Sequence, residues 1–438
     1  MGVWQLIVIE AINDMELLIA LSIGMMGALY GFIKLLRYKQ INSFIALGDP
    51  LILAVLIPEV TASIVPVYMY IRDWMYRPDD FIYSYISTEL AFWFGLIIFA
   101  YVLNKGKCRY DDRLICEDNV ANKRKLYILY LILYFLIRGI YFYNCGGFPL
   151  LSDKYYTFFF EMSPVATRLS MDIYLIVTIL WVDSLSYIKQ RKMNYFIGTL
   201  LVLSFVLSGQ KGLITNVFKA FFFVEVYRFW SGKSLRMING RNAIIVVVLA
   251  LIVALIPLIM KSLDSENYSP IMAMLIRIIG NGDSFPLFYG LPQTSSILFE
   301  NTGVFNYIWA NLAAFHFHFD YNLDYIPTTE LKWIMDRSLG EYVVPLIRHN
   351  LIAVKVFGLD FGWIYSLFVG ALIGGVTRYV FPRISGINFY TYLIVCLIYE
   401  AVVECIAIYQ VTLRFEPVIF NLIIILLFYV IFEKKIRI

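Results

Sequence analysis

Residues 123–154 read KRKLYILYLILYFLIRGIYFYNCGGFPLLSDK, and the fold is predicted from this stretch outward. Three consecutive cations precede a long apolar run, which ends where two glycines and a proline follow. A helix needs about twenty predominantly apolar residues to cross a bilayer. Glycine and proline end a helix and turn the chain. The stretch therefore predicts a membrane span over 126–144, with a loop on the side opposite to the cations.

The rest of the chain repeats this pattern. Of its 438 residues, 61% are hydrophobic and only 16% are charged, whereas about a quarter of the residues of a soluble domain are charged. The apolar residues lie in blocks of about twenty. We therefore expect an all-α, polytopic transmembrane helix bundle that forms a single integral membrane domain over 1–438, with about eleven spans and a range of ten to fourteen. The expected spans are 15–36, 47–71, 82–104, 126–144, 167–187, 195–209, 213–229, 242–260, 359–380, 388–410 and 417–432.

The positive charges predict an orientation for these spans. Every second connection is basic, and basic connections stay on the cytoplasmic side. This places the N-terminus outside and the C-terminus inside, which an odd number of spans satisfies. The net charge of +4 says little about partners, and we expect no nucleic-acid partner. The basic connections hold Lys34, Arg37 and Lys39; Lys105 to Lys125; Lys189, Arg191 and Lys192; Arg228 to Arg241; Arg378 and Arg383; and Lys434, Lys435 and Arg437.

Two external segments are longer than turns. The smaller one covers 144–167, and the larger one covers 262–357 between the eighth and ninth expected spans. The larger segment is too polar to span a membrane, yet it is rich in aromatic residues. A structureless loop of this length is improbable, so we expect short helices at the outer interface. No internal repeat is visible, which weighs against the duplicated folds of many transporters.

Cations stand beside apolar residues on the expected external side. Lys211 lies between two short spans, so this hairpin is expected to stop below the outer surface. Arginine makes bidentate bonds to phosphate oxygens and stays charged when partly buried. These cations favour a pocket for a lipid-linked phosphate; the alternative is that each binds the headgroups of ordinary lipids. The candidates are Lys154, Arg168, Lys211, Arg277, Arg348 and Arg414.

The chain has three histidines, and all lie in or at the end of 262–357. His316 and His318 would need a third ligand such as Asp320 to hold a metal, and we expect no metal site. His349 follows Arg348 and could take a proton from a hydroxyl beside a bound phosphate. The alternative is an interfacial histidine bonded to a backbone carbonyl.

Further ionisable residues lie inside the expected spans, where charges are costly and usually face a cavity or a partner. Glu400 and Glu404 are four apart and share a helix face. They indicate either a proton or ion path or the polar wall of a cavity. Arg138 could neutralise a carboxylate on a neighbouring helix. The remaining residues of this kind are Glu59, Glu89 and Asp172.

Three motifs carry a resemblance to a known family. GGFPLLS, at Gly146 to Ser152, is similar to the Gly-x-Pro-Leu-Leu-Ser element of O-antigen and capsular polysaccharide polymerases. SGQKG, at Ser208 to Gly212, resembles the Ser-Gly-x-Arg/Lys turn of these enzymes. HNLIAVKVFGLDFG begins at His349 and resembles a His-Asn…Gly-x-x-Gly element that polymerases share with O-antigen ligases. Its spacing departs from that element, since seven residues separate Asn350 from Gly358 and three separate Gly358 from Gly362.

The resemblance implies a glycosyltransferase C-type membrane fold in a bacterial inner membrane. It implies a metal-independent enzyme without a cofactor, which joins undecaprenyl-pyrophosphate-linked repeat units on the periplasmic face. Its partners would be these lipid-linked glycans, membrane lipids, a chain-length regulator and a flippase. His349 would be the base, with Asp283 or Asp320 behind it, and the six cations above would bind pyrophosphate and glycan. An O-antigen ligase and a polysaccharide flippase or transporter are the alternatives.

Overall fold

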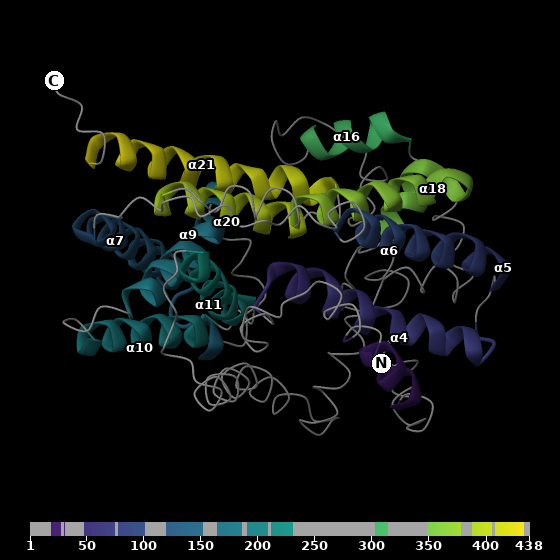
Figure 1. Ribbon diagram of the computed structural model, residues 1–438, viewed down its shortest axis with the longest axis horizontal. Helices are drawn as coiled ribbons and strands as arrows, with labels where there is room; N and C mark the ends of the chain where they lie inside the picture. The colour runs from purple at the N-terminus through teal and green to yellow at the C-terminus, as the bar shows by residue number, and fades with distance from the viewer. Residues whose placement is uncertain are drawn as a thin grey trace.

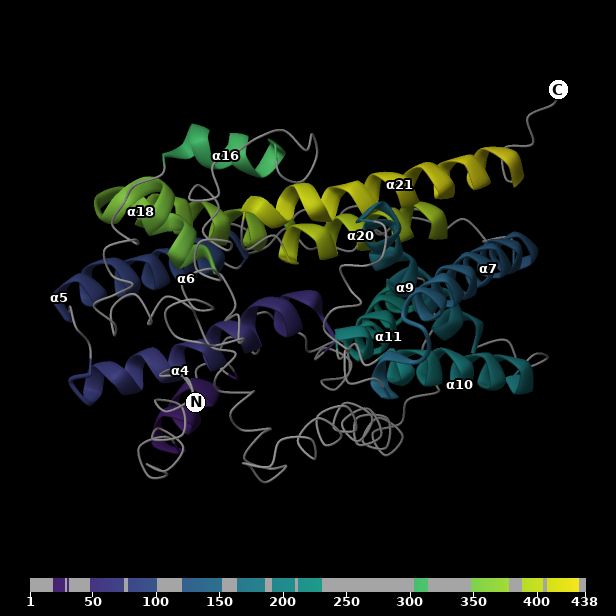
Figure 2. The same ribbon diagram turned by 180° about the vertical axis from the view of Figure 1, so that it is seen from behind.

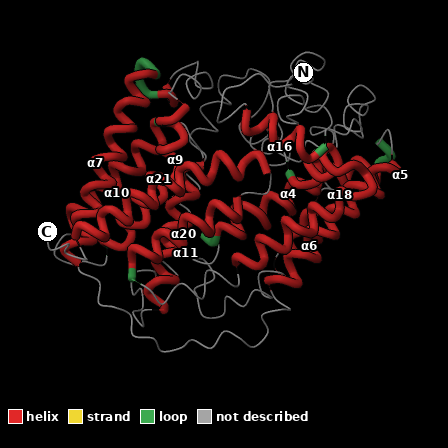
Figure 3. Tube along the Cα trace, turned by 90° about the horizontal axis from the view of Figure 1, so that it is seen from above, coloured by secondary structure: helices red, strands yellow, loops and turns green. Residues whose placement is uncertain are grey.

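A computed structural model of the 438-residue chain describes part of its length. Within that part every regular element is helical and no strand occurs (Figure 3), which confirms the all-α class. The described residues are 19–27, 30, 48–74, 78–100, 120–151, 164–185, 191–208, 212–230, 303–313, 348–377, 388–404 and 408–432.

The helices form two groups with two further helices between them. Figure 1 and Figure 2 show α7, α9, α10 and α11 toward one end of the long axis and α4, α5, α6 and α18 toward the other, with α20 and α21 running between them. The elements are η2 (Leu51–Leu56), α4 (Ile57–Ile71), α5 (Pro78–Phe81), η3 (Ile82–Ile86), α6 (Ser87–Ala100), α7 (Val120–Asn144), η5 (Pro149–Leu151), α9 (Pro164–Ser184), α10 (Arg191–Leu207), α11 (Gly212–Trp230), α16 (Val304–Leu312), α18 (His349–Gly375), α20 (Phe389–Glu404) and α21 (Ile408–Phe432).

Three helical segments of the described chain are long and apolar enough to cross a membrane. They are Pro78–Ala100, Val120–Asn144 and His349–Gly375, and shorter apolar helices cover Leu51–Val60, Lys192–Leu207 and Glu416–Phe432. These segments support transmembrane character, and the count of about eleven spans stays an expectation. The expected span 242–260, most of 15–36 and most of the segment 262–357 lie outside the described residues. The short helix α16 is the part of 262–357 described before Arg348.

Helix α7 ends where the sequence predicts a break. The glycines after Asn144 have positive φ values, 66° at Gly146 and 150° at Gly147, which favour residues without a side chain. The Gly147 amide donates to the Phe142 carbonyl at 3.0 Å and closes the helix end. The start of α7 differs from the prediction, because the helix already includes Lys123, which is buried beside a carboxylate.

Several helix ends meet around that carboxylate. The Asp183 side chain at the end of α9 lies 3.9 Å from Lys123 Nζ and accepts a 3.3 Å hydrogen bond from Arg228 at the end of α11. Asn122 of α7 donates to the Phe432 carbonyl at the end of α21. Antiparallel helices that cross a membrane in alternation would gather their ends in this way. All these ends lie at connections that the charge pattern predicts to be on one side.

Helices α6 and α18 pack with their backbones in contact. Gly370 and Gly374 of α18 form a GALIG sequence, and small residues four apart let membrane helices approach closely. A Cβ atom on Gly374 would lie 2.7 Å from the Leu96 carbonyl oxygen, and one on Gly370 would collide with the Phe92 carbonyl. This contact holds α6 and α18 in fixed register.

We expect Gly370→Leu to destabilise the folded protein by more than about 3 kcal/mol, because overpacking a tight contact commonly costs about 1–3 kcal/mol and here the obstacle is backbone. The measurement is thermal unfolding of detergent-solubilised protein. Gly139→Leu is the matched control, since nothing lies within 4 Å of a Cβ atom built on Gly139 of α7. Equal stability of the two variants would contradict the packing described.

Helix α18 reverses direction at Gly358, whose φ of 79° and ψ of 175° are not helical. On either side, His349 Nδ1 lies 2.9 Å from Ser366 Oγ, although the two residues are 17 apart. A Cβ atom on Gly362 would lie 3.1 Å from the Ala353 carbonyl. A straight helix would separate such pairs by about 1.5 Å per residue. The segment is therefore a helical hairpin with arms over 349–357 and 359–375.

The first arm of α18 covers the end of the expected external segment 262–357. Every residue from Arg348 to Val356 is buried. An interfacial position was the alternative expectation for His349, and its side chain is instead enclosed by protein. The arm is apolar enough to pack inside the protein, and Gly358 permits the reversal that brings it against the following helix.

Candidate functional site

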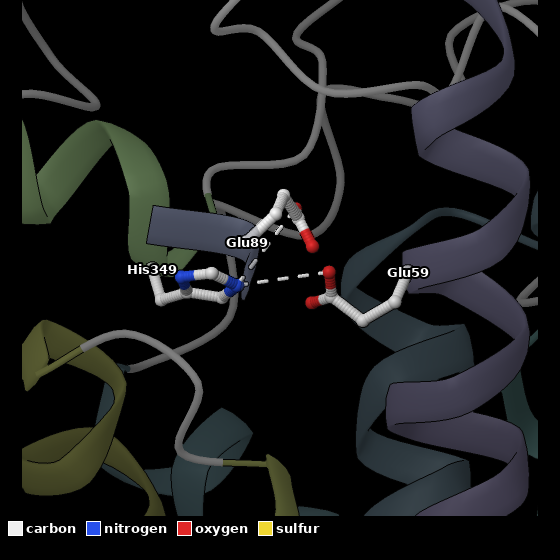
Figure 4. Close-up of side chains that lie close together, drawn as sticks. All are labelled: Glu59, Glu89 and His349. Atoms are coloured by element: carbon white, nitrogen blue, oxygen red, sulfur yellow. Dashed lines mark ion pairs between the residues drawn. The ribbon is translucent and has the colours of Figure 1, made fainter. Parts of the chain in front are cut away.

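A buried ionic cluster forms where α4, α6 and the first arm of α18 meet. Glu59 comes from α4, Glu89 from the start of α6, and Arg348, His349 and Asn350 from the start of α18. Four of these residues are at most 3% exposed, and the Glu89 side chain is 12% exposed. Figure 4 shows His349 directed at both carboxylates. Ionisable groups buried in this way are expensive and usually functional in membrane proteins.

Arg348 supplies the positive charge of the cluster. Its Nε donates to Glu59 Oε1 at 3.1 Å, and its Nη2 forms an ion pair with the other oxygen of the same carboxylate. Nη2 also lies 3.4 Å from Glu89 Oε1. A planar guanidinium suits such a two-carboxylate arrangement because its donors form a rigid fork. With both glutamates ionised, one cation faces two anions.

The His349 ring is held by two contacts and faces the two carboxylates. Its Nδ1 shares a 2.9 Å hydrogen bond with Ser366 Oγ in the second arm of α18. Its ring stacks on Phe92 with centroids 4.3 Å apart. Its Nε2 lies 3.7 Å from Glu59 Oε2 and 3.9 Å from Glu89 Oε1, and has no hydrogen-bond partner among the described residues. The partner of Nδ1 is therefore a side-chain hydroxyl, whereas the alternative expectation for His349 was a bond to a backbone carbonyl.

Asn350, which follows His349 in the sequence, also contacts Glu89. Its Nδ2 donates to Glu89 Oε1 at 2.9 Å and to Thr88 Oγ1 at 3.3 Å. Arg348 has extended backbone geometry at the start of the helix, with φ of −115° and ψ of 176°. Three consecutive side chains therefore lie near Glu89, whereas uniform helical geometry would point them in different directions.

A second buried ionic group links α11 to α20. Lys219 Nζ lies 2.6 Å from Glu400 Oε1 and 2.5 Å from Glu404 Oε1, and the lysine side chain is 5% exposed. The two glutamates share a helix face as predicted. Their lysine partner was not predicted, although a single lysine inside the apolar span 213–229 was a visible signal.

Arg138 lies among aromatic rings, and its predicted pairing with a carboxylate on a neighbouring helix stays a prediction. Its guanidinium lies 4.4 Å from the ring centroid of Tyr174, 5.6 Å from that of Tyr141 and 5.8 Å from that of Tyr134. Cations are attracted to the faces of aromatic rings at such distances. Aromatic rings on α7 and α9 therefore form much of its surroundings.

Of the predicted site residues, Arg348 and His349 are brought together. Arg168 lies in the first half of α9, away from the end that holds Asp183. Arg414 lies in the first half of α21, away from the end that holds Phe432. Glu59 and Glu89 were predicted to be charges within spans and were not assigned to the site. Asn350 stood in the quoted motif without a site role, and Ser366 was not predicted. The predicted residues outside the described chain are Lys154, Lys211, Arg277, Asp283 and Asp320, together with His316 and His318.

The fold and the cluster define an all-helical protein with apolar helices and a buried ionic core. Comparison with protein-family models, with curated proteins and with solved structures finds no match to this chain. The polymerase resemblance therefore rests on the motifs quoted above.

Proposed function

We propose that the chain is a bacterial inner-membrane polysaccharide polymerase of glycosyltransferase C type. It joins undecaprenyl-pyrophosphate-linked oligosaccharide repeat units into O-antigen or capsule chains on the periplasmic face. The observation that carries the proposal is the buried cluster around Arg348, His349 and Asn350. Those residues lie at the motif that resembles polymerases, and they assemble carboxylates, a cation and an imidazole where the helices are apolar.

The proposed reaction is one displacement. The hydroxyl of the acceptor repeat unit attacks the anomeric carbon of the donor glycan and forms the new glycosidic bond. The bond from that carbon to the pyrophosphate oxygen breaks, and undecaprenyl pyrophosphate leaves with the electron pair. The hydroxyl proton passes to a base, and cations stabilise the charge that develops on the leaving group.

His349 is the proposed base. The contact of Nδ1 with Ser366 holds the ring, and Nε2 has no hydrogen-bond partner among the described residues and is available to take a proton. Arg348 is the proposed pyrophosphate ligand of the cluster, and the phosphate oxygens would replace Glu59 and Glu89 as its partners. Because His349 is 0% exposed, the reaction requires the cluster to open to substrate. The further proposed cations are Lys154, Arg168, Lys211, Arg277 and Arg414. The further proposed carboxylates are Asp283 and Asp320.

Deletion of the gene in a bacterium that builds its surface glycan with this protein tests the proposal. We expect the deletion strain to show a single repeat unit on its lipid core, and the wild-type gene to restore the ladder of repeat lengths. Loss of a ligase or a flippase would instead remove even the single unit. A ladder that survives the deletion would contradict the polymerase assignment.

One observation favours a second candidate, an ion-coupled transporter. Lys219 and its two glutamates lie inside apolar helices, and carboxylates with a buried cation form proton and ion relays in transporters. The deletion experiment separates the candidates, because loss of a transporter of the repeat unit leaves no glycan on the lipid core.

A further inference from the structure

We propose that Glu59, Glu89 and His349 form a binding site for one divalent transition-metal ion, with Zn²⁺ as the preferred ion. One donor atom from each of the three residues lies within 4.8 Å of the other two. The residues come from α4, α6 and α18, and Figure 4 shows their side chains converging on one point. An imidazole nitrogen with two carboxylates is a donor set that suits Zn²⁺ and disfavours Mg²⁺, which binds mainly oxygen.

His349 supplies an observation independent of the two acids. Its Nε2 is fully buried, has no hydrogen-bond partner in the described part of the chain, and faces two carboxylate oxygens. If Nδ1 donates its hydrogen to Ser366 Oγ, Nε2 presents a lone pair to anions, which is unfavourable unless a cation lies between them. Metal-binding histidines almost always bond through their other ring nitrogen in this way.

The imidazole nitrogen already lies near both carboxylates. Nε2 lies 3.7 Å from Glu59 Oε2 and 3.9 Å from Glu89 Oε1. Donors around a tetrahedral ion that binds at about 2.0–2.2 Å are about 3.4 Å apart. A contraction of roughly half an ångström would bring Nε2 to this distance from each of the two oxygens. The oxygens of the two carboxylates lie within 4.8 Å of each other and would approach further around the ion. Asn350 already holds Glu89 at 2.9 Å, as outer partners do for metal-ligating carboxylates.

Arg348 is the competitor of the ion. Its guanidinium pairs with the same two carboxylates, so a bound ion would displace it from them. The site therefore takes either the guanidinium or the metal. This inference does not depend on the proposed polymerase function. If both hold, a metal on Nε2 occupies the lone pair of the proposed base and is expected to inhibit glycosyl transfer.

Titration of the purified full-length chain in detergent with Co²⁺ alone tests the site, because bound Co²⁺ gives visible absorption. We expect one Co²⁺ per chain, displaced by Zn²⁺ and not by an equal concentration of Mg²⁺. Glu59→Gln, Glu89→Gln and His349→Ala are each expected to weaken binding at least about tenfold. The absence of Co²⁺ absorption in the wild-type chain would overturn the proposal, whether or not the variants fold.

The histidine content of the chain provides a matched control. The other two of its three histidines are His316 and His318. The double variant His316→Ala/His318→Ala is expected to bind Co²⁺ as the wild type does. Binding that is lost in this double variant and kept in His349→Ala would place the ion elsewhere and overturn the proposal.

Discussion

Arg348→Met is expected to destabilise the folded protein by about 3–5 kcal/mol, since removal of one partner from a buried ion pair leaves an uncompensated charge. Glu59 is 1% exposed and would keep its carboxylate in the protein interior without the guanidinium. Glu89, with a side chain 12% exposed, would lose its 3.4 Å contact with Nη2. Both effects act on the junction of α4, α6 and α18, so the whole junction is expected to loosen.

Thermal unfolding of the purified chain in detergent measures this effect. The triple variant Arg348→Met/Glu59→Gln/Glu89→Gln removes the orphaned charges and is expected to recover most of the lost stability. Arg124→Met is the matched control, because Arg124 is an exposed arginine on α7. If Arg348→Met is as stable as Arg124→Met, the cluster does not hold these helices together.

Lys219→Met is expected to have a comparable effect, also about 3–5 kcal/mol. The lysine is 4% exposed and is the cation within 2.6 Å of both Glu400 and Glu404. Without it, two carboxylates one helical turn apart would face each other in an apolar setting, and like charges four residues apart repel. We expect the contact of α11 with α20 to fail first.

The same unfolding measurement applies, with Lys192→Met as the control because Lys192 lies exposed on α10. Adding Glu400→Gln and Glu404→Gln to Lys219→Met is expected to restore stability. If the triple variant unfolds as easily as Lys219→Met, the loss comes from packing of the lysine stem and not from charge.

The helices and their main break were predictable because their signals are local. A run of apolar residues marks a helix in α7, and the positive φ of Gly146 and Gly147 follows from residues that are adjacent in sequence. The shared face of Glu400 and Glu404 was also a local inference from helical spacing. Local signals do not fix helix ends, so the start of α7 at Val120 was missed.

The contacts between helices were not predictable from the sequence. Arg348 meets Glu59 across 289 positions, and Lys219 meets Glu400 across 181. No periodicity within one helix indicates which distant charge is its partner. The hairpin at Gly358 was missed because an apolar arm followed by a glycine resembles the approach to a span as much as a reversal. Only tertiary packing, such as the contact of His349 with Ser366, distinguishes the two.

We propose that this chain polymerises repeat units through His349. The most direct measurement is the length distribution of surface glycan in the deletion strain carrying either the wild-type gene or His349→Ala. Membrane levels of both proteins are matched by quantifying the chain in isolated membranes. We predict a full ladder with the wild type and a single repeat unit with His349→Ala. A full ladder with His349→Ala would contradict the claim.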